Sequence, residues 1–589
     1  MRMPVIAFSP TGIPSFPANF HPASRYSVRL GVLGVMSSYG AIGDDDFEPL
    51  VSSPPSVPGS STTRSQHRQR QPYLFTGGLG LSREGSMVSL HSEDDFRDHN
   101  MALRYRLYSR LDPGGQQLRM PDHVIPSEYF SILPFDDLKD SSGKQSSLVT
   151  IFSLWNTMMG TSLLAMPWAL QQAGLFWGIF LMLALALLCF YTAFRVLDSP
   201  KGIPGMDPVL LEFSDVCRYF LGKGGEYLAV GFSVIVLLGG IMVYWVLMSN
   251  FLFYTGTVVY EALQPNSSTI PVMENKTFTC DVYCPMDESL PPLLEERGSQ
   301  PLIDSWFPSS WDFDQLWQLQ RTVPVYLAFL TFPLMNFKSP TFFTKFNVLG
   351  TLSVFYLLIF TGSKLVECGF NMNFVDADSI HYAKSFSWRF PALTGTMTLS
   401  YFIHNAVITI LRNQKNPENN ARDLSIGYSL AAFCYVFIGF TFYAGFPVQR
   451  SCISDNFLNN FGAGDILSST ARMFLLFQMI TVLPLLMFLI RSQLCYAFLG
   501  KTWPGISSVV LLNCIIICIA VSVAIFYPRV GSILRYVGSL AGLVYVFALP
   551  CIIYMKKLHS EGKLTRTKRT IHITIIGLGV LNFFSQFVI

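Results

Sequence analysis

A cluster of polar and small side chains lies at the centre of an otherwise apolar stretch, residues 147–170. The stretch is long enough to cross a bilayer as a helix, which takes about 20 residues. A break in helical hydrogen bonding at that depth is tolerated only where protein or a cavity surrounds it. Secondary transporters often hold a substrate at such a break, whereas the alternative is close helix packing through small residues. The candidate substrate-binding residues are Asn156, Thr157, Met158, Met159, Gly160 and Thr161.

Eleven apolar segments are predicted to span a membrane and to position this cluster. The chain is 50% hydrophobic and only 13% charged, whereas soluble domains contain roughly 25% charged residues. The predicted fold class is therefore an all-α membrane protein with about 11 transmembrane helices. The segments are 148–170, 174–196, 226–260, 323–336, 344–366, 391–411, 424–447, 466–490, 505–527, 532–555 and 570–589.

The sixth segment has interruptions like those of the first. Gly395, Ser400 and several threonines lie within 391–411. If the first ten helices form an inverted five-plus-five repeat, helix six mirrors helix one, and two broken helices at corresponding positions indicate a transport site. His404 lies in the same span, and an ionisable residue there is a functional candidate by default. The alternative, which we favour slightly, is a histidine that hydrogen-bonds to a neighbouring helix.

The eighth segment adds oxygen-bearing side chains, among them Thr481. Oxygen ligands suit hard cations, so Thr481 and Asn156 are candidate sodium ligands together with the carbonyls freed at the first break. The alternative, at least equally favoured, is that Thr481 bonds its own helix backbone. Arg472, Phe477 and Val482 also fit a weak basic–aromatic–aliphatic pattern proposed for cholesterol contact.

Residues 1–143 differ in composition from the membrane-spanning part, 144–589. Proline- and serine-rich stretches such as Ser52–Ser65 cannot bury enough apolar surface to fold, and no secretory signal is present. We therefore expect a disordered cytosolic tail. Metal-ligand spacing, a nucleophile elbow and a phosphate-binding loop are all missing from the sequence, so we expect neither an enzyme nor a bound cofactor other than sodium. A net charge of only +3 gives no reason to expect a nucleic-acid partner.

Two signals orient the predicted helices. The loop 263–322 contains glycosylation sequons at Asn266 and Asn275, which place it in the lumen or outside the cell. The loop between the last two spans is rich in lysine and arginine, so the positive-inside rule places it in the cytosol. With eleven spans the signals agree, and they predict a cytosolic N-terminus and a lumenal C-terminus.

The same topology places three cysteines on the oxidising side, Cys280, Cys284 and Cys452, with Cys368 near its membrane edge. A disulfide between the large loop and the loop after the seventh helix is expected there. The residues alone leave the pairing open.

Long runs of this sequence resemble one family. They are WNTMMGTS, IMVYWVLMSNFLF, NFKSP, KFNVLGT, FIHN and LLFQMITV, beginning at residues 155, 241, 336, 345, 402 and 475. They are similar to the amino acid/auxin permease superfamily, and within it to the lysosomal, arginine-sensing branch. The resemblance extends from about residue 105 to the C-terminus, whereas residues 1–100 show none.

The resemblance implies a broken-helix, five-plus-five fold with an eleventh helix, and arginine binding at the first break. It implies substrate contacts by residues 156–161, an important role for Thr161, and sodium ligation by Asn156 and Thr481 as in better-characterised relatives. It favours a Cys284–Cys452 disulfide. Leucine and other neutral amino acids are the further substrates expected.

Two pieces of the tail, in the segment 105–130, resemble the part of that branch that binds the Ragulator–Rag GTPase complex. Tyr108 and Leu111 form an aromatic and aliphatic pair, and Pro121 and Pro126 bound an extended piece. A disordered tail can order on a groove through such anchors. The residues 108–111 also match a tyrosine-based sorting signal.

Three interpretations follow. The first is a transporter of the lysosomal and late endosomal membrane that binds arginine, mediates arginine-regulated efflux of amino acids, and signals their sufficiency to the target of rapamycin kinase complex. The second is an ordinary plasma-membrane, sodium-coupled neutral amino acid importer. The third is a receptor that binds amino acid without moving it. The pair of interrupted helices favours transport, and the tail segment favours the first interpretation.

Overall fold

The helical bundle accounts for nearly all of the structure. The computed structural model describes residues 110–111, 118–119, 125, 130, 145–201, 203, 211–263, 280–285, 313–338, 340–412, 414–462 and 464–588. Within these ranges the only strands are β1 (Arg110–Leu111) and β2 (Leu118–Arg119), which pair antiparallel with Leu111 opposite Leu118. The prediction of an all-α membrane protein is confirmed.

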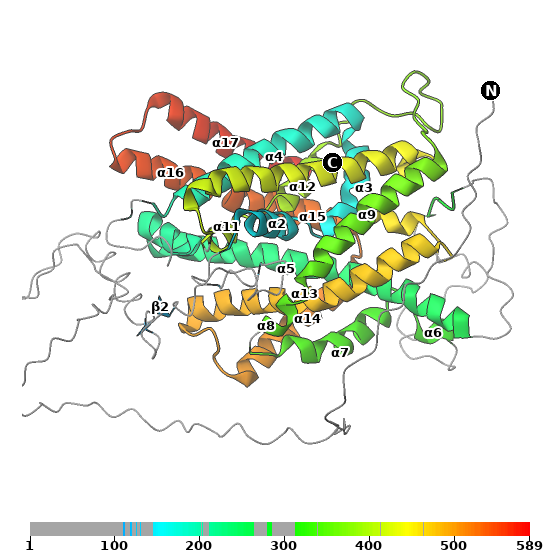
Figure 1. Ribbon diagram of the computed structural model, residues 1–589, viewed down its shortest axis with the longest axis horizontal. Helices are drawn as coiled ribbons and strands as arrows, with labels where there is room; N and C mark the ends of the chain where they lie inside the picture. The colour runs from blue at the N-terminus through cyan, green and yellow to red at the C-terminus, as the bar shows by residue number, and fades with distance from the viewer. Residues whose placement is uncertain are drawn as a thin grey trace, which may run out of the picture. The chain divides into compact units, whose positions relative to one another are not determined.

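The described helices follow one another along the chain, and the longest connections between them are residues 264–312 and 369–390 (Figure 1). They are α2 (Ser147–Met158), η2 (Thr161–Ala165), α3 (Met166–Ala173), α4 (Leu175–Asp198), α5 (Phe213–Leu263), α6 (Phe313–Leu316), α7 (Val323–Met335), α8 (Thr341–Thr344), α9 (Asn347–Cys368), α10 (Pro391–Ser400), α11 (Val407–Leu411), η4 (Pro417–Asn419), α12 (Asn420–Gly445), η5 (Arg450–Cys452), η6 (Phe457–Asn460), α13 (Ile466–Leu499), α14 (Ile506–Phe526), α15 (Val530–Ala541), η7 (Gly542–Ala548), α16 (Leu549–Ser560) and α17 (Arg566–Ser585).

Each predicted span coincides with a helix or with a run of consecutive helices. In the described part of the chain, seven helices are long and apolar enough to cross a membrane, and the bent pair formed by α2 with η2–α3 makes an eighth. The other three predicted spans fall on α7, which is short, on α10 with α11, which are separated by a break, and on α17, which begins with basic residues. The inverted repeat stays a prediction.

Local sequence explains where several helices begin and end. Asp465 caps α13, because its carboxylate accepts from the N–H of Ser468 at 2.9 Å. Gly500 ends the same helix in the left-handed conformation, with φ 68°, which glycine adopts without strain. Gly222, with φ 74°, bends α5 near its N-terminal end.

Small residues let α10 and α15 pack closely. A Cβ at Gly395 would lie 2.7 Å from the carbonyl oxygen of Arg535, so the two backbones meet where neither helix has a side chain between them. This contact fixes the first part of the interrupted helix six against the bundle.

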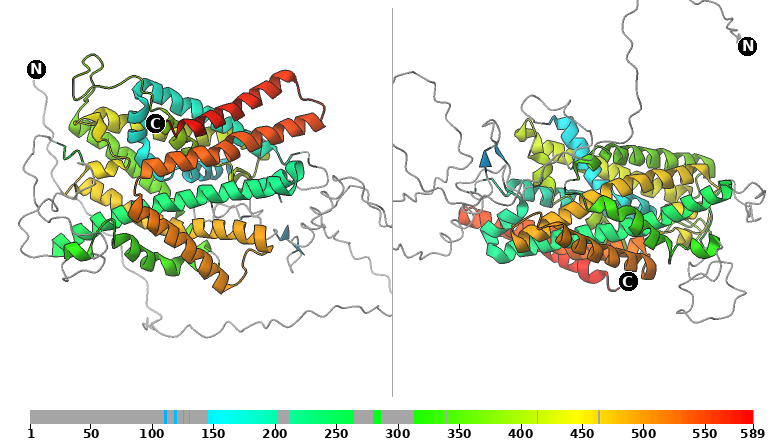
Figure 2. Two further views of the ribbon diagram at one scale, coloured as in Figure 1. Left: turned by 180° about the vertical axis from the view of Figure 1, so that it is seen from behind. Right: turned by 90° about the horizontal axis from the view of Figure 1, so that it is seen from below.

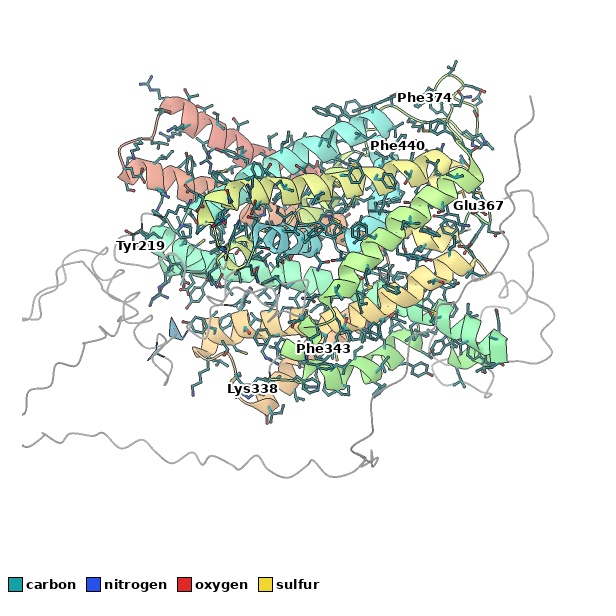
Figure 3. All side chains as sticks on the ribbon, in the orientation of Figure 1. Tyr219, Lys338, Phe343, Glu367, Phe374 and Phe440 are labelled. Carbon is teal, nitrogen blue, oxygen red and sulfur yellow. A yellow bond between two sulfur atoms is a disulfide. The ribbon has the colours of Figure 1, made fainter. Side chains whose placement is uncertain are left out.

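The two ends of the bundle differ in character (Figure 3). One end contains disulfides Cys284–Cys452 and Cys280–Cys368, with Cα separations of 5.0 and 5.2 Å. Glu367 and Phe374 are labelled at this disulfide end, and Tyr219 at the opposite end. At that opposite end, α16 and α17 form a hairpin on the outside of the bundle (Figure 2).

One residue of the tail, Ile125, is buried in the core at the hairpin end. Its N–H donates to Glu212 Oε1 at 3.2 Å, and its carbonyl accepts from Arg412 Nη1 at 3.1 Å. Arg412 also forms a 2.7 Å ion pair with Glu212. The segment 105–130 therefore contacts the bundle at this position.

Candidate functional site

The first membrane-spanning segment is broken where the sequence predicts it. Helix α2 ends at Met158, and the chain resumes as η2 at Thr161 with a bend of 52°. Met159 leaves the helical conformation with ψ 86°, and Gly160 is extended with ψ −164°. Ending one helix and starting another leaves carbonyls on one side of the break and N–H groups on the other without intrahelical partners.

The side chains around the break are not all available to a ligand. Thr157 Oγ1 donates to the carbonyl of Ser153 at 2.7 Å, within its own helix. Met158 and Met159 are buried. Beside Gly160 there is room, because an added Cβ would meet nothing closer than the Met158 carbonyl oxygen at 4.0 Å. Thr161 is half-buried at the start of η2, next to this space.

The second break lies between α10 and α11. Helix α10 ends at Ser400, and residues 401–406 are turns and irregular backbone before α11 begins at Val407. Within the break, Tyr401 and Ile403 are completely buried. Irregular backbone at this position is therefore enclosed by protein, as its unpaired polar groups require.

Tyr435 of α12 connects the two breaks. Its hydroxyl lies 2.6 Å from the carbonyl oxygen of Met158 and 3.0 Å from that of Ser400, the last helical residues before each break. Ser162 Oγ lies 3.3 Å from the same hydroxyl. About two turns earlier on α12, the Tyr428 hydroxyl donates to the Tyr401 carbonyl at 3.0 Å.

His404 is held by a neighbouring helix. Its ring is completely buried, and its Nε2 lies 2.9 Å from the Thr192 hydroxyl of α4. This is the structural alternative that the sequence already favoured slightly. The histidine therefore links the second break to α4. Tyr435 contacts the same break four residues earlier, at Ser400.

Asn156 faces a polar cluster built by α9 and α13. Its Oδ1 is buried and has no hydrogen-bond partner in the described part of the chain. A Cβ at Gly350 would lie 2.8 Å from this oxygen and 3.0 Å from Gln478 Nε2, so both amides converge on the bare face of Gly350. Gln478 Oε1 accepts from Ser353 Oγ at 2.5 Å.

Thr481, the other candidate sodium ligand, donates to the carbonyl of Gln478 at 2.7 Å, within its own helix. This bond uses its proton and leaves the lone pairs of its oxygen free to meet a cation. The unpartnered Asn156 oxygen is a hard donor of the kind a sodium ion prefers. The donor chemistry of both residues suits the predicted ion, and the site itself stays a prediction.

Comparison with known proteins now decides the class. The model of the family "Transmembrane amino acid transporter protein" matches residues 143–272 and 306–589. The chain belongs to this family. A Caenorhabditis elegans protein named sodium-coupled neutral amino acid transporter 9 homolog is 64% identical to this chain. The alignment covers 94% of this chain and 95% of the length of that protein. Proteins named neutral amino acid transporter 9 are 40% identical in Xenopus tropicalis and 41% in Rattus norvegicus, over 85% and 83% of this chain and 93% and 89% of their own.

The protein is therefore a multi-pass amino acid transporter and not an enzyme. The family match includes both broken helices and the Tyr435 helix. The superfamily resemblance drawn from the sequence is confirmed.

The transporter does not place the three residues of the cholesterol pattern on one surface. Arg472 is completely buried, and its guanidinium donates to the carbonyls of Leu458 and Phe461 at 2.7 Å each. Phe477, in contrast, is 52% exposed. The cholesterol pattern, which also includes Val482, stays a prediction. Its basic and aromatic residues do not share one exposed face.

Several predicted residues lie outside the described part of the transporter. These are Tyr108, Pro121 and Pro126 of the tail and the sequon residues Asn266 and Asn275. Leu111 is described only through its backbone in β1. The Cys284–Cys452 disulfide is the pairing that the resemblance favoured, whereas Cys280–Cys368 joins the same loop to the end of α9 and was not predicted.

The most important residue that sequence reasoning missed is Tyr435. A tyrosine within an apolar span is an ordinary core residue, so its type carries no signal. Only the coincidence of two broken helices beside one aromatic helix identifies it. Gly350 was visible in the run KFNVLGT, but its role depends on the amides of Asn156 and Gln478 that meet there.

Proposed function

We propose that this transporter binds arginine at the first break and mediates arginine-regulated efflux of amino acids across a lysosomal and late endosomal membrane. The observation that carries the proposal is the bend of 52° between α2 and η2, with open space beside Gly160. An amino acid presents a carboxylate and an ammonium group. The N–H groups at the start of η2–α3 suit the carboxylate, and the carbonyls at the end of α2 suit the ammonium.

The cluster around Asn156 is the proposed sodium site. An ion there would draw on Asn156 Oδ1 and on the lone pairs of Thr481 Oγ1, next to the carbonyls freed at the end of α2. Because the cluster directly precedes the break, ion binding and substrate binding would share one segment of backbone. The printed name of the Caenorhabditis elegans relative, which includes sodium coupling, supports this proposal.

The disulfide end is proposed to face the lumen. Disulfides form in oxidising compartments, and the sequons Asn266 and Asn275 lie in the loop that both disulfides hold. Substituting glutamine at both sequons should remove a glycosidase-sensitive mobility shift. The hairpin end, with its lysines and arginines, would then lie in the cytosol.

The tail is proposed to signal amino acid sufficiency. Tyr108, Leu111, Pro121 and Pro126 would anchor it to the Ragulator complex and the Rag GTPases, and through them influence the target of rapamycin kinase complex. The support is the resemblance of these residues to the binding segment of that branch, together with the apolar type of the anchors. Cholesterol is the weakest of the proposed ligands, because the guanidinium of Arg472 in its pattern is buried and bonded to backbone carbonyls.

Efflux from proteoliposomes tests the proposal. Vesicles loaded with labelled leucine and containing the purified transporter should release it faster when arginine is present, and a sodium gradient should change the rate. If the rate of release depends on the sodium gradient but not on arginine, an ordinary plasma-membrane neutral amino acid importer would be favoured instead. Binding of arginine with no flux of any amino acid would contradict transport.

A further inference from the structure

The loop between α16 and α17 carries a concentration of positive charge that the fold does not neutralise. Residues 556–569 contain six lysines and arginines against a single acid, Glu561. Three of the six are occupied. Lys556 Nζ donates to the Phe220 carbonyl at 3.0 Å, Lys557 Nζ lies 3.7 Å from an Asp198 carboxylate oxygen, and Lys563 Nζ lies 3.0 Å from Glu561.

The other three cations are Arg566, Lys568 and Arg569, all exposed. In the part of the chain that the structure describes, none of these side chains forms an ion pair or hydrogen bond. They crowd into four consecutive positions at the start of α17, where like charges repel one another. The repulsion among these cations would be relieved most by binding an anion from outside the chain.

The exposed face of α17 shows where that anion must lie. Arg566 and Arg569 recur at helical spacing with Ile573, Val580 and Phe584, so the two arginines continue a stripe of exposed apolar residues. The opposite face, with buried His572, Ile575 and Gly579, packs against the bundle. In a family that spans a membrane, an exposed apolar stripe of this kind is expected to face lipid.

Arg569 lies four residues before Ile573, which is about 6 Å along a helix axis. If the stripe that begins at Ile573 lies against acyl chains, the arginines one turn before it reach the level of the headgroups. Guanidinium groups bind phosphate oxygens in a bidentate manner. Thr570 is exposed beside them, but its hydroxyl donates to the Arg566 carbonyl at 3.1 Å, so the arginines must supply the ligands. Three uncompensated cations also exceed the single charge of a phosphodiester.

We infer that the basic hairpin, defined as residues 556–570, binds the headgroup of an anionic phospholipid that carries a phosphomonoester in addition to its phosphodiester, with Arg566 and Arg569 as its principal ligands. The lipid is favoured over a soluble phosphate because acyl chains lying along the Ile573–Phe584 stripe hold the headgroup at this level. This inference does not depend on the substrate proposed above.

The test uses the full chain in phosphatidylcholine nanodiscs with a fluorescent phosphatidylinositol 4-phosphate probe. Replacing Arg566 and Arg569 together by glutamine should weaken binding of the probe about tenfold or more, since each basic residue near a membrane surface contributes substantially. Arg566→Lys with Arg569→Lys, which keeps the charge but loses bidentate geometry, should weaken it less. Thermal unfolding of each variant checks that the bundle is intact.

The matched control is Arg389→Gln with Arg529→Gln, which removes two exposed arginines at the disulfide end. Binding should be unchanged in this variant. Equal losses in both double variants, or no loss in the hairpin variant, would overturn the site. Equal affinity for a charge-matched amount of phosphatidylserine would show that the site does not require a phosphomonoester. Equal affinity for the soluble inositol phosphate headgroup would overturn the choice of a lipid.

Discussion

The hydroxyl oxygen of Tyr435 lies 2.6 Å from the carbonyl oxygen of Met158. The same hydroxyl lies 3.0 Å from the carbonyl oxygen of Ser400, on the other broken helix. A phenol has a single proton, so it donates fully to one carbonyl at a time or shares the proton between both. The two breaks are thereby coupled, because strengthening one bond weakens the other.

Replacing Tyr435 with phenylalanine tests this coupling. Interhelical hydrogen bonds in membranes contribute about 0.6 kcal/mol on average, so the variant should lose little thermal stability. Transport should fall by about tenfold, equivalent to about 1.4 kcal/mol on the barrier, because the two breaks no longer move together. The comparison is Tyr428→Phe, which removes one bond to the second break alone. Equal transport by both variants would disprove the coupling.

The sequence predicted the positions of the helices and of both breaks, because apolar length and polar interruption are local features. It could not predict which helix joins the breaks, since Tyr435 meets Met158 across 277 residues of sequence. The second disulfide, Cys280–Cys368, was not predicted either, because its cysteines are 88 residues apart in the sequence. The role of Thr481 stayed open because residue type does not show whether its hydroxyl meets an ion or its own helix, and in the folded protein it donates to the Gln478 carbonyl.

Gly350→Ala should perturb the proposed ion site. Its Cβ would come within 2.8 Å of Asn156 Oδ1 and 3.0 Å of Gln478 Nε2, so both amides must move. Overpacking of this kind costs about 1–3 kcal/mol. We expect the sodium dependence of transport to weaken more than folding does, measured as the sodium concentration for half-maximal flux.

The control for this variant is Gly362→Ala on the same helix, where the new Cβ would meet only Phe437 Cζ at an ordinary 3.9 Å. Its sodium dependence should match the wild type. If Gly350→Ala also leaves the sodium dependence unchanged, Asn156 does not belong to an ion site.

Acidification should destabilise the loop between α9 and α10. Burial, and then the neighbouring Arg450 guanidinium, lower the pKa of His381 from its ordinary value of 6.5. The unfolded chain therefore binds the proton first, so stability is complete above pH 6.5 and falls as the pH drops from there through the lowered pKa. His381→Gln should flatten the loss of melting temperature in this range. A steeper loss in the variant would show that the sign is wrong.

The tail anchors are tested separately from transport. Tyr108→Ala or Leu111→Ala in fragment 1–143 should each weaken binding to the Ragulator–Rag complex by about 1–3 kcal/mol, as expected for interface anchors. Transport by the full chain should barely change, because these residues precede the predicted membrane-spanning segments in the sequence. Undiminished binding with both anchors removed would refute the assignment.

Thr161→Trp tests the central claim most directly. Thr161 is half-buried, so the substitution replaces no packed core residue, and an added Cβ at the neighbouring Gly160 would meet nothing closer than 4.0 Å. The bulky indole is expected to occupy the proposed substrate site beside the first break. Arginine binding to the purified variant, measured by equilibrium binding of labelled arginine, should be abolished while its melting temperature stays close to that of the wild type. Wild-type arginine affinity in a stable Thr161→Trp variant would contradict a substrate site at this break.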